Sequence, residues 1–123
     1  MRIFTRTREK EFVPHEEALA LKELGFDESC FGRFNPDNDL IVSHTETYNT
    51  DFRKTLFTQA PTFSQAFRFF REKHDCHHTI HRNKKYVGIA YSSVVNFNID
   101  EFNTYEEAEL ACLKQLIEIS KNK

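Results

Sequence analysis

A chain of 123 residues, 39% of them hydrophobic, is long enough to bury the core of one domain, and this composition excludes a disordered protein. Its 17 basic and 19 acidic residues give a net charge of −2, which argues against a general binder of polyanions. No apolar run is long enough to span a membrane, and three widely spaced cysteines make no disulfide framework, so we expect a cytoplasmic protein. With 13 Phe and no Trp, phenylalanine rings are expected to fill the core.

The N-terminal stretch 2–10 is locally basic and is predicted to be a solvated arm or edge strand. Its charged residues are Arg2, Arg6, Arg8 and Lys10, with Glu9 as the acid among them.

Three segments of the chain begin in the same way, and each is predicted to start a helix. They are FVPHEEALALKELGF from Phe12, APTFSQAFRFFREKH from Ala60 and FNTYEEAELACLKQL from Phe102. Thr62 and Thr104 are suited to cap helix N-termini through their hydroxyl groups. Gln65 and Glu107 follow three residues later, which completes the spacing of a capping box.

The first helix differs from the others, because Pro14 replaces the threonine and cannot cap through its side chain. Gly25 is expected to end this helix. After each of the first two helices the pattern changes to period two, which predicts strands. Asn35-Pro36-Asp37-Asn38 and Asn83-Lys84-Lys85 are the predicted turns between these strands.

Together these signals predict an α+β protein of two αββ units plus a C-terminal helix, with a small antiparallel sheet and helices mainly on one face. The units are expected at 12–48 and 61–98 and the C-terminal helix at 102–120, all within a single domain of residues 1–123. The connector 49–60 contains apolar residues and is expected to pack on the core, with one helical turn as an option.

The C-terminal helix is apolar over a wide arc. Its one line of polar side chains expected to face solvent, which we call the wet line, consists of Glu107, Lys114 and Glu118. Phe69 lies about 100° away from the apolar stripe of the second helix, so its ring is expected on the exposed face. We therefore take Phe69, Lys114 and Glu118 as a candidate protein interface. An open sheet face and a widely apolar helix are also compatible with a homodimer.

The sequence HDCHHTIH, residues 74–81, concentrates four of the six histidines and suggests a metal site. The weak candidate ligands are His74, Cys76, His78 and His81, with His15, His44 and Cys30 as more distant additions. On a helix several would share a face, but on a strand His77 and His81 would be about 13 Å apart. Thr79 and Ile80 favour the strand, so no metal is expected if the helix ends before Cys76.

A cysteine nucleophile activated by histidine is another interpretation of the same segment. Cys76 has His77 and His78 as neighbours, but adjacent strand residues point to opposite faces. With three glycines in total, no phosphate-binding loop is expected, and no catalytic motif occurs. We therefore expect neither a cofactor nor an enzyme.

Nucleic acid is an alternative partner, because the hairpin at 77–91 combines basic and aromatic side chains that could stack on bases. The candidate residues are His77, His81, Arg82, Lys84, Lys85, Tyr86 and Tyr91. The acidic balance of the whole chain makes a solvated turn the favoured interpretation.

Three segments, LALKELGFDESCFGRF, PTFSQAFRFFREKH and FNTYEEAELACLKQLIEI, resemble small uncharacterised proteins of Bacteroidetes-type bacteria and of their phages or prophages. The resemblance covers the chain from about Phe12 to Ile119 and carries no assigned activity. It implies a small accessory protein of a mobile genetic element. The sequence therefore predicts a non-catalytic accessory or protein-interaction domain, with nucleic-acid binding and a metal-dependent function as alternatives.

Overall fold

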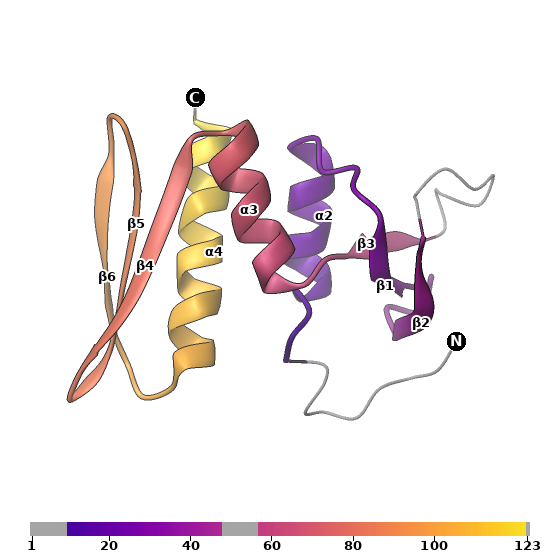
Figure 1. The fold of residues 1–123 in the computed structure, drawn as a ribbon, viewed down its shortest axis with the longest axis horizontal. Helices are drawn as coiled ribbons and strands as arrows, with labels where there is room; N and C mark the ends of the chain where they lie inside the picture. Colours follow the sequence, from indigo (N-terminus) through magenta and orange to yellow (C-terminus); the bar gives the residue numbers. More distant parts are fainter. Residues whose placement is uncertain (1–9, 48–56, 123) are drawn as a thin grey trace. The chain divides into compact units, whose positions relative to one another are not determined.

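The structure is a computed structural model that describes residues 10–47 and 57–122, in the order helix, three strands, helix, three strands and helix (Figure 1). The predicted α+β class with a C-terminal helix is confirmed. The strands form two antiparallel three-stranded sheets, where one sheet was expected. Each sheet lies in one of two compact units, residues 1–65 (unit 1) and 66–123 (unit 2). The basic stretch 2–9 lies outside the described residues.

Unit 1 begins with helix α2 (His15–Glu23), whose end is fixed by local hydrogen bonds. Gly25 adopts a φ of 101°, a conformation that is costly for residues with a Cβ atom. The N–H groups of Gly25 and Phe26 donate to the carbonyls of Lys22 and Leu21 at 3.1 and 3.0 Å. This arrangement is a Schellman motif, and it confirms the predicted stop.

The sheet of unit 1 contains β1 (Cys30–Phe34), β2 (Leu40–Thr47) and β3 (Thr58–Ala60), with β1 in the middle. The predicted turn between β1 and β2 is confirmed, because Asn35 accepts the N–H groups of Asp37 and Asp39, each at 2.9 Å.

Strand β3 corrects the expectation for the connector 49–60, whose last residues were not expected to pair. Ala60 pairs with Gly32, which places β3 beside the central strand. Residues 49–56 of the connector, including the segment for which a helical turn was an option, lie outside the described residues.

Gly32 marks the closest approach inside unit 1. A Cβ atom at this position would lie 2.8 Å from Cε1 of Phe12 and 3.1 Å from the carbonyl oxygen of Ala60. The Phe12 ring therefore rests on the bare backbone of β1, and this face of the sheet is covered by the segment that leads into α2. The buried apolar side chains of unit 1 include Phe12, Val13, Ala18, Leu21, Phe26, Cys30, Phe34, Val42 and Ala60.

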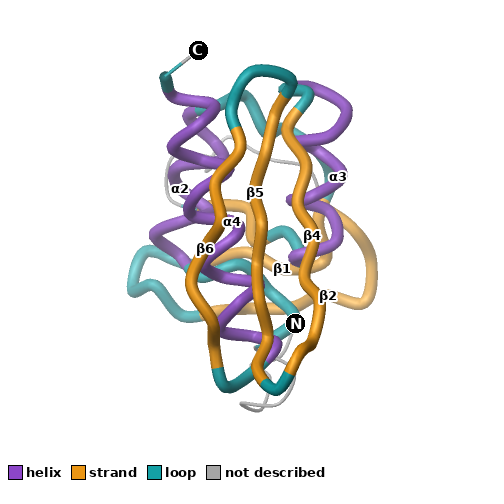
Figure 2. The backbone as a smooth tube through the Cα atoms, turned by 90° about the vertical axis from the view of Figure 1, so that its left-hand side faces the viewer, coloured by secondary structure: helices purple, strands orange, loops and turns teal. Residues whose placement is uncertain are grey.

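Unit 2 contains a meander of β4 (Cys76–Asn83), β5 (Lys85–Ser92) and β6 (Asn96–Phe102), with β5 in the middle. Helix α4 (Tyr105–Lys121) packs against all three strands and covers one face of the sheet (Figure 2). The sequence predicted the β4–β5 hairpin but not a full third strand, because the second unit was expected to end at residue 98.

Both predicted capping boxes are present. Gln65 donates its N–H to the Thr62 hydroxyl at 3.2 Å, and the Thr62 N–H donates to the Gln65 side chain at 3.1 Å. Thr104 and Glu107 make the same reciprocal pair at 3.1 and 3.2 Å, at the start of α4. Pro14 occupies the N-cap position of α2 without a side-chain cap.

Helix α4 is buried on more than one side, as its wide apolar arc predicted. Its buried residues are Ala108, Cys112, Leu113, Leu116, Ile117, Ile119 and Ser120. Glu107, Lys114 and Glu118 are exposed, so the predicted wet line is confirmed.

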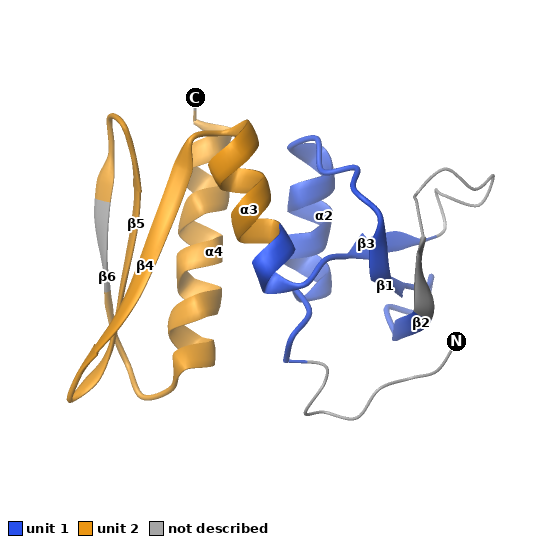
Figure 3. Cartoon of the chain, viewed as in Figure 1, with its two compact units in different colours: residues 1–65 blue, residues 66–123 orange. Residues whose placement is uncertain are grey.

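The boundary between the two units falls inside helix α3 (Phe63–Lys73), between Gln65 and Ala66 (Figure 3). The two sheets also differ in strand order, because unit 1 has its first strand in the middle and unit 2 its second. The repeated helix start is therefore not accompanied by a repeated sheet topology. None of the helices in residues 10–47 and 57–122 has the length and apolar character that crossing a membrane requires.

Candidate functional site: the open face of the second sheet

The histidine-rich segment 74–81 begins just after α3 ends at Lys73. Asp75 has a φ of 51°, which turns the chain, and β4 starts at Cys76. The helix therefore ends before Cys76, and the imidazoles from His77 onward alternate between the two faces of a strand.

Cys76 and His78 point to the face covered by helices. The Cys76 Sγ lies 3.6 Å from the Ser120 Oγ of α4 and donates to the His74 carbonyl at 3.3 Å. The His78 ring stacks on the Phe67 ring of α3, with centroids 3.6 Å apart and planes 18° apart. Burial lowers the pKa of His78 to about 4, and the nearby Arg71 guanidinium acts in the same direction.

His77 lies on the opposite face. Its ring stacks on Tyr91 of β5, with centroids 5.4 Å apart and planes 22° apart. Its Nε2 atom lies 3.1 Å from the Asp75 carboxylate. This contact is an ion pair when the imidazole is protonated.

The four weak metal candidates do not form a site together. Within the described part of the chain, no three His, Cys, Asp or Glu side chains lie close enough to hold a metal ion. The His74 ring packs instead against the rings of Phe69 and Phe70, with centroids 5.1 and 5.9 Å away.

The expectation of an exposed Phe69 is wrong, because its side chain is 3% exposed. Its ring packs edge-on against Phe70 in addition to His74, so α3 buries more of its circumference than the apolar stripe indicated. Of the predicted interface residues, Lys114 and Glu118 remain exposed on α4.

The geometry gives Cys76 no base among its sequence neighbours. His77 lies on the other face of the strand, and the His78 ring is held against Phe67. The thiols of Cys30, Cys76 and Cys112 are all buried. Burial raises the pKa of Cys112 to about 11, which keeps this thiol protonated at neutral pH.

The face of the second sheet opposite α4 is covered by no helix of unit 2, and we call it the open face. It consists of His77, Thr79, His81, Lys85, Val87, Ile89 and Tyr91. Val87, Ile89 and Tyr91 are partly exposed, whereas Gly88 and Ala90 between them are buried against the helix side. Figure 2 looks onto this face, where no helix of unit 2 covers the strands.

The small residues of β5 explain why the larger ones face outward. Gly88 and Ala90 leave room for α4 to lie close to the sheet, so the bulkier Val87, Ile89 and Tyr91 occupy the opposite face. The alternation was visible in the sequence as KYVGIAYS. The sequence predicted an open sheet face but not the residues that form it, because the rings of this hairpin were assigned to the core.

The candidate nucleic-acid residues are divided between the two faces. His77, His81, Lys85 and Tyr91 belong to the open face. Tyr86 lies on the helix side, edge-on to Tyr105 at 6.0 Å, and the Arg82 guanidinium lies 5.4 Å from the centre of the Tyr86 ring. Lys84 occupies the turn with a φ of 58°.

The open face therefore has a central apolar row, imidazoles on one side of that row and basic residues at the hairpin end. This composition is suited to contact with another macromolecule. No protein-family model matches this chain, and comparisons with curated proteins and with solved structures found no match.

Proposed function

We propose that the chain is a non-catalytic interaction protein that binds a partner protein through the open face. The observation that carries this proposal is the row of Val87, Ile89 and Tyr91, which turns its large apolar side chains away from α4. When a partner covers apolar surface that was in contact with water, the free energy falls and binding is favoured.

The charges around this row favour an acidic partner. Lys84 and Lys85 are exposed at the hairpin end, where Glu101 of β6 is the nearest acid along the paired strands. A partner with an apolar centre and carboxylates on one side would match both features.

Single-stranded nucleic acid is the second candidate occupant of this face. The stacked rings of His77 and Tyr91 support it, since such rings can stack on bases. Tyr86 and Arg82 lie on the helix side, so they are not part of the open face, which weakens the case for nucleic acid. A protein partner is therefore preferred.

The biological setting proposed is a cytoplasmic accessory role in a phage or another mobile element. Its support is the resemblance of the sequence segments and the absence of a disulfide bond among the three cysteines, which is typical of a reducing compartment.

The proposal is tested by photo-crosslinking in cells that encode the protein. p-Benzoylphenylalanine replaces Ile89 in one variant and Lys114 in a second. A third variant carries it in place of Lys121, an exposed residue of α4, as the control. We expect one defined protein adduct from position 89 and none from position 121.

Each other outcome overturns the proposal in a different way. An adduct from position 114 alone would move the interface to the wet line of α4. A covalent dimer of the chain would make a second copy the occupant, and an adduct with nucleic acid would establish the second candidate. Equal adducts from positions 89 and 121 would show that the open face is not selective.

A further inference from the structure

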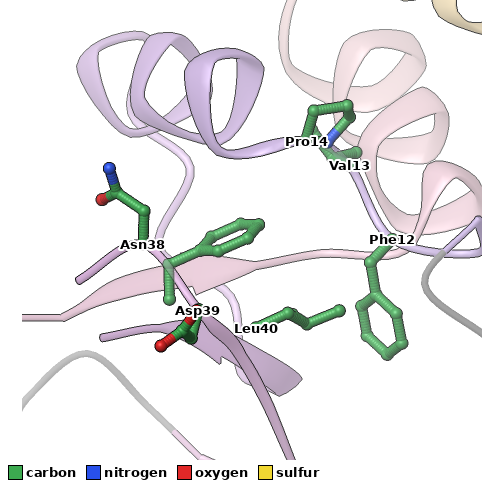
Figure 4. A pocket seen from close by; sticks show the side chains of 7 residues that line it. Phe12, Val13, Pro14, Asn38, Asp39 and Leu40 are labelled. Atoms are coloured by element: carbon green, nitrogen blue, oxygen red, sulfur yellow. The ribbon is translucent and has the colours of Figure 1, made fainter. Parts of the chain in front are cut away.

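Unit 1 contains a pocket of about 360 Å³ between the α2 leader segment and the β1–β2 turn (Figure 4). It is lined by Phe12, Val13, Pro14, Phe34, Asn38, Asp39 and Leu40. In Figure 4 Leu40 points toward Phe12, while Asn38 and Asp39 lie on the side away from Phe12, with their side chains pointing in opposite directions. The pocket therefore has apolar walls and one polar end.

The apolar walls are held in place by contacts outside the pocket. The Phe12 ring rests on the backbone of Gly32, and the Val13 N–H donates to the Pro61 carbonyl at 2.9 Å. The Phe34 ring packs edge-on against His15, with centroids 5.1 Å apart. A ligand would therefore meet walls that are already formed.

The polar end is also fixed by the fold. The Asp39 N–H donates to the Asn35 side chain at 2.9 Å, and the Asn35 N–H donates back to the Asp39 carbonyl at 3.1 Å. The Asp39 side chain is exposed and makes no ion pair with the described residues. Its carboxylate is available to a ligand.

Acidic residues outnumber basic ones in the described part of unit 1, where Lys10 is the exposed cation closest in sequence to Phe12. Residues 10–47 and 57–65 contain nine Asp and Glu against three Lys and Arg. Glu11, Glu16 and Asp37, which are close in sequence to lining residues, are exposed. Such a surface attracts cations and repels anions.

We propose that this pocket binds a cationic amphipathic segment of a partner protein, with an apolar side chain against Phe12, Phe34 and Leu40 and a Lys or Arg beside Asp39. The volume of about 360 Å³ lies at the small end of the range for ligand sites, so it accommodates the apolar side chain, with the Lys or Arg at the exposed polar end, and not a large cofactor. The pocket is built from unit 1 alone and does not depend on the function proposed for the open face.

The test uses the full chain, a small cation and a small anion of similar shape, and a cationic peptide. 2-Phenylethylammonium, phenylacetate and the peptide acetyl-Lys-Leu-Lys-amide are titrated while ¹H–¹⁵N NMR spectra are recorded. We expect the two cations to shift the amide signals of Phe12, Val13 and Leu40, with phenylacetate binding several times more weakly.

Asp39→Asn should weaken binding of both cations about two- to fivefold, as expected for an exposed ion pair. Asp27→Asn is the matched control, because it changes the net charge equally at an exposed residue that does not line the pocket. Equal binding of 2-phenylethylammonium and phenylacetate would overturn the proposal, as would equal effects of the two variants. Shifts confined to residues outside the pocket would also overturn it.

Discussion

His78 of β4 lies face to face with Phe67 of α3, with ring centroids 3.6 Å apart. This contact places an ionisable ring in the packed layer between a helix and a sheet edge, where charging it is unfavourable. Burial, with Arg71 as a second cause, lowers the pKa of His78 from 6.5 to about 4. One of the histidines considered as a metal ligand is therefore part of the apolar packing.

His78 should make the protein acid-sensitive. Because its folded-state pKa is below its unfolded value, its contribution to stability is present above pH 6.5 and is lost as the pH falls toward 4. His78→Phe keeps a stacking ring but cannot be protonated. The free energy of unfolding of this variant should therefore fall by about 1–2 kcal/mol less than that of the wild type on acidification, a figure that allows for the partial solvent access of His78. Urea unfolding at pH 7 and pH 4.5 measures it, with His81→Gln as the exposed control. Equal pH dependence in His78→Phe and the wild type would contradict this interpretation.

Glu109 of α4 should act with the opposite sign. Burial, with the Glu106 carboxylate as a second cause, raises the pKa of Glu109 from 4.5 to about 7. Stability contributed by the protonated form is therefore lost as the pH rises from 4.5 through 7. Glu109→Gln should stabilise the protein by about 1 kcal/mol at pH 8 and have little effect at pH 4.

The control for Glu109 is Glu118→Gln, an exposed position on the same helix. This variant should change the free energy of unfolding equally at pH 4 and pH 8. If Glu109→Gln behaved in the same way, the carboxyl would not be buried as the structure indicates.

The capping box at Thr104 should contribute measurably to stability. Its hydroxyl accepts the Glu107 N–H at 3.1 Å and so satisfies a donor that the helix itself cannot. Thr104→Ala should lower the free energy of unfolding by about 1 kcal/mol, whereas Thr104→Ser, which keeps the oxygen, should lose only a few tenths. Chemical denaturation of both variants is sufficient, and equal losses would show that the cap has no role.

Gly32 should not tolerate a methyl group. Gly32→Ala would press a Cβ atom against the Phe12 ring and should cost about 1–3 kcal/mol. Phe12→Leu in the same chain should recover part of that loss. Gly25→Ala is the comparison, because nothing lies within 4 Å of its Cβ position and its cost comes from backbone strain at a φ of 101°.

A double-mutant cycle separates these two causes. Coupling to Phe12→Leu is expected for Gly32→Ala and not for Gly25→Ala. Additive behaviour at Gly32 would show that the ring can move aside freely.

The sequence predicted best what depends on neighbouring residues. The capping boxes of Thr62 and Thr104 and the helix stop at Gly25 were correct, because each depends on hydrogen bonds between residues a few positions apart. The end of α3 before Cys76 was also predicted, since the β-branched residues after Asp75 favour a strand.

Features that depend on distant partners were missed. Ala60 of β3 pairs with Gly32, a residue far away in the chain, and nothing local marks three residues as a strand. Phe69 was misplaced for a related reason, because a helical period gives its angle on α3 but not how much of the helix is covered. An open sheet face was expected, but its residues were not identified, because a pattern of alternation does not say which of two faces a helix will cover.

Helix α3 has a consequence for any attempt to treat the protein as two modules. Its capping turn, from Thr62 to Gln65, lies in unit 1, while the rest of the helix, from Ala66 onward, lies in unit 2. A cut at the boundary would separate the capping residues from the rest of the helix. The first turn of the helix in the second fragment would then fray, and the capping residues in the first fragment would have no helix to cap. Separate expression and limited proteolysis should therefore both fail to give two stable halves at this point.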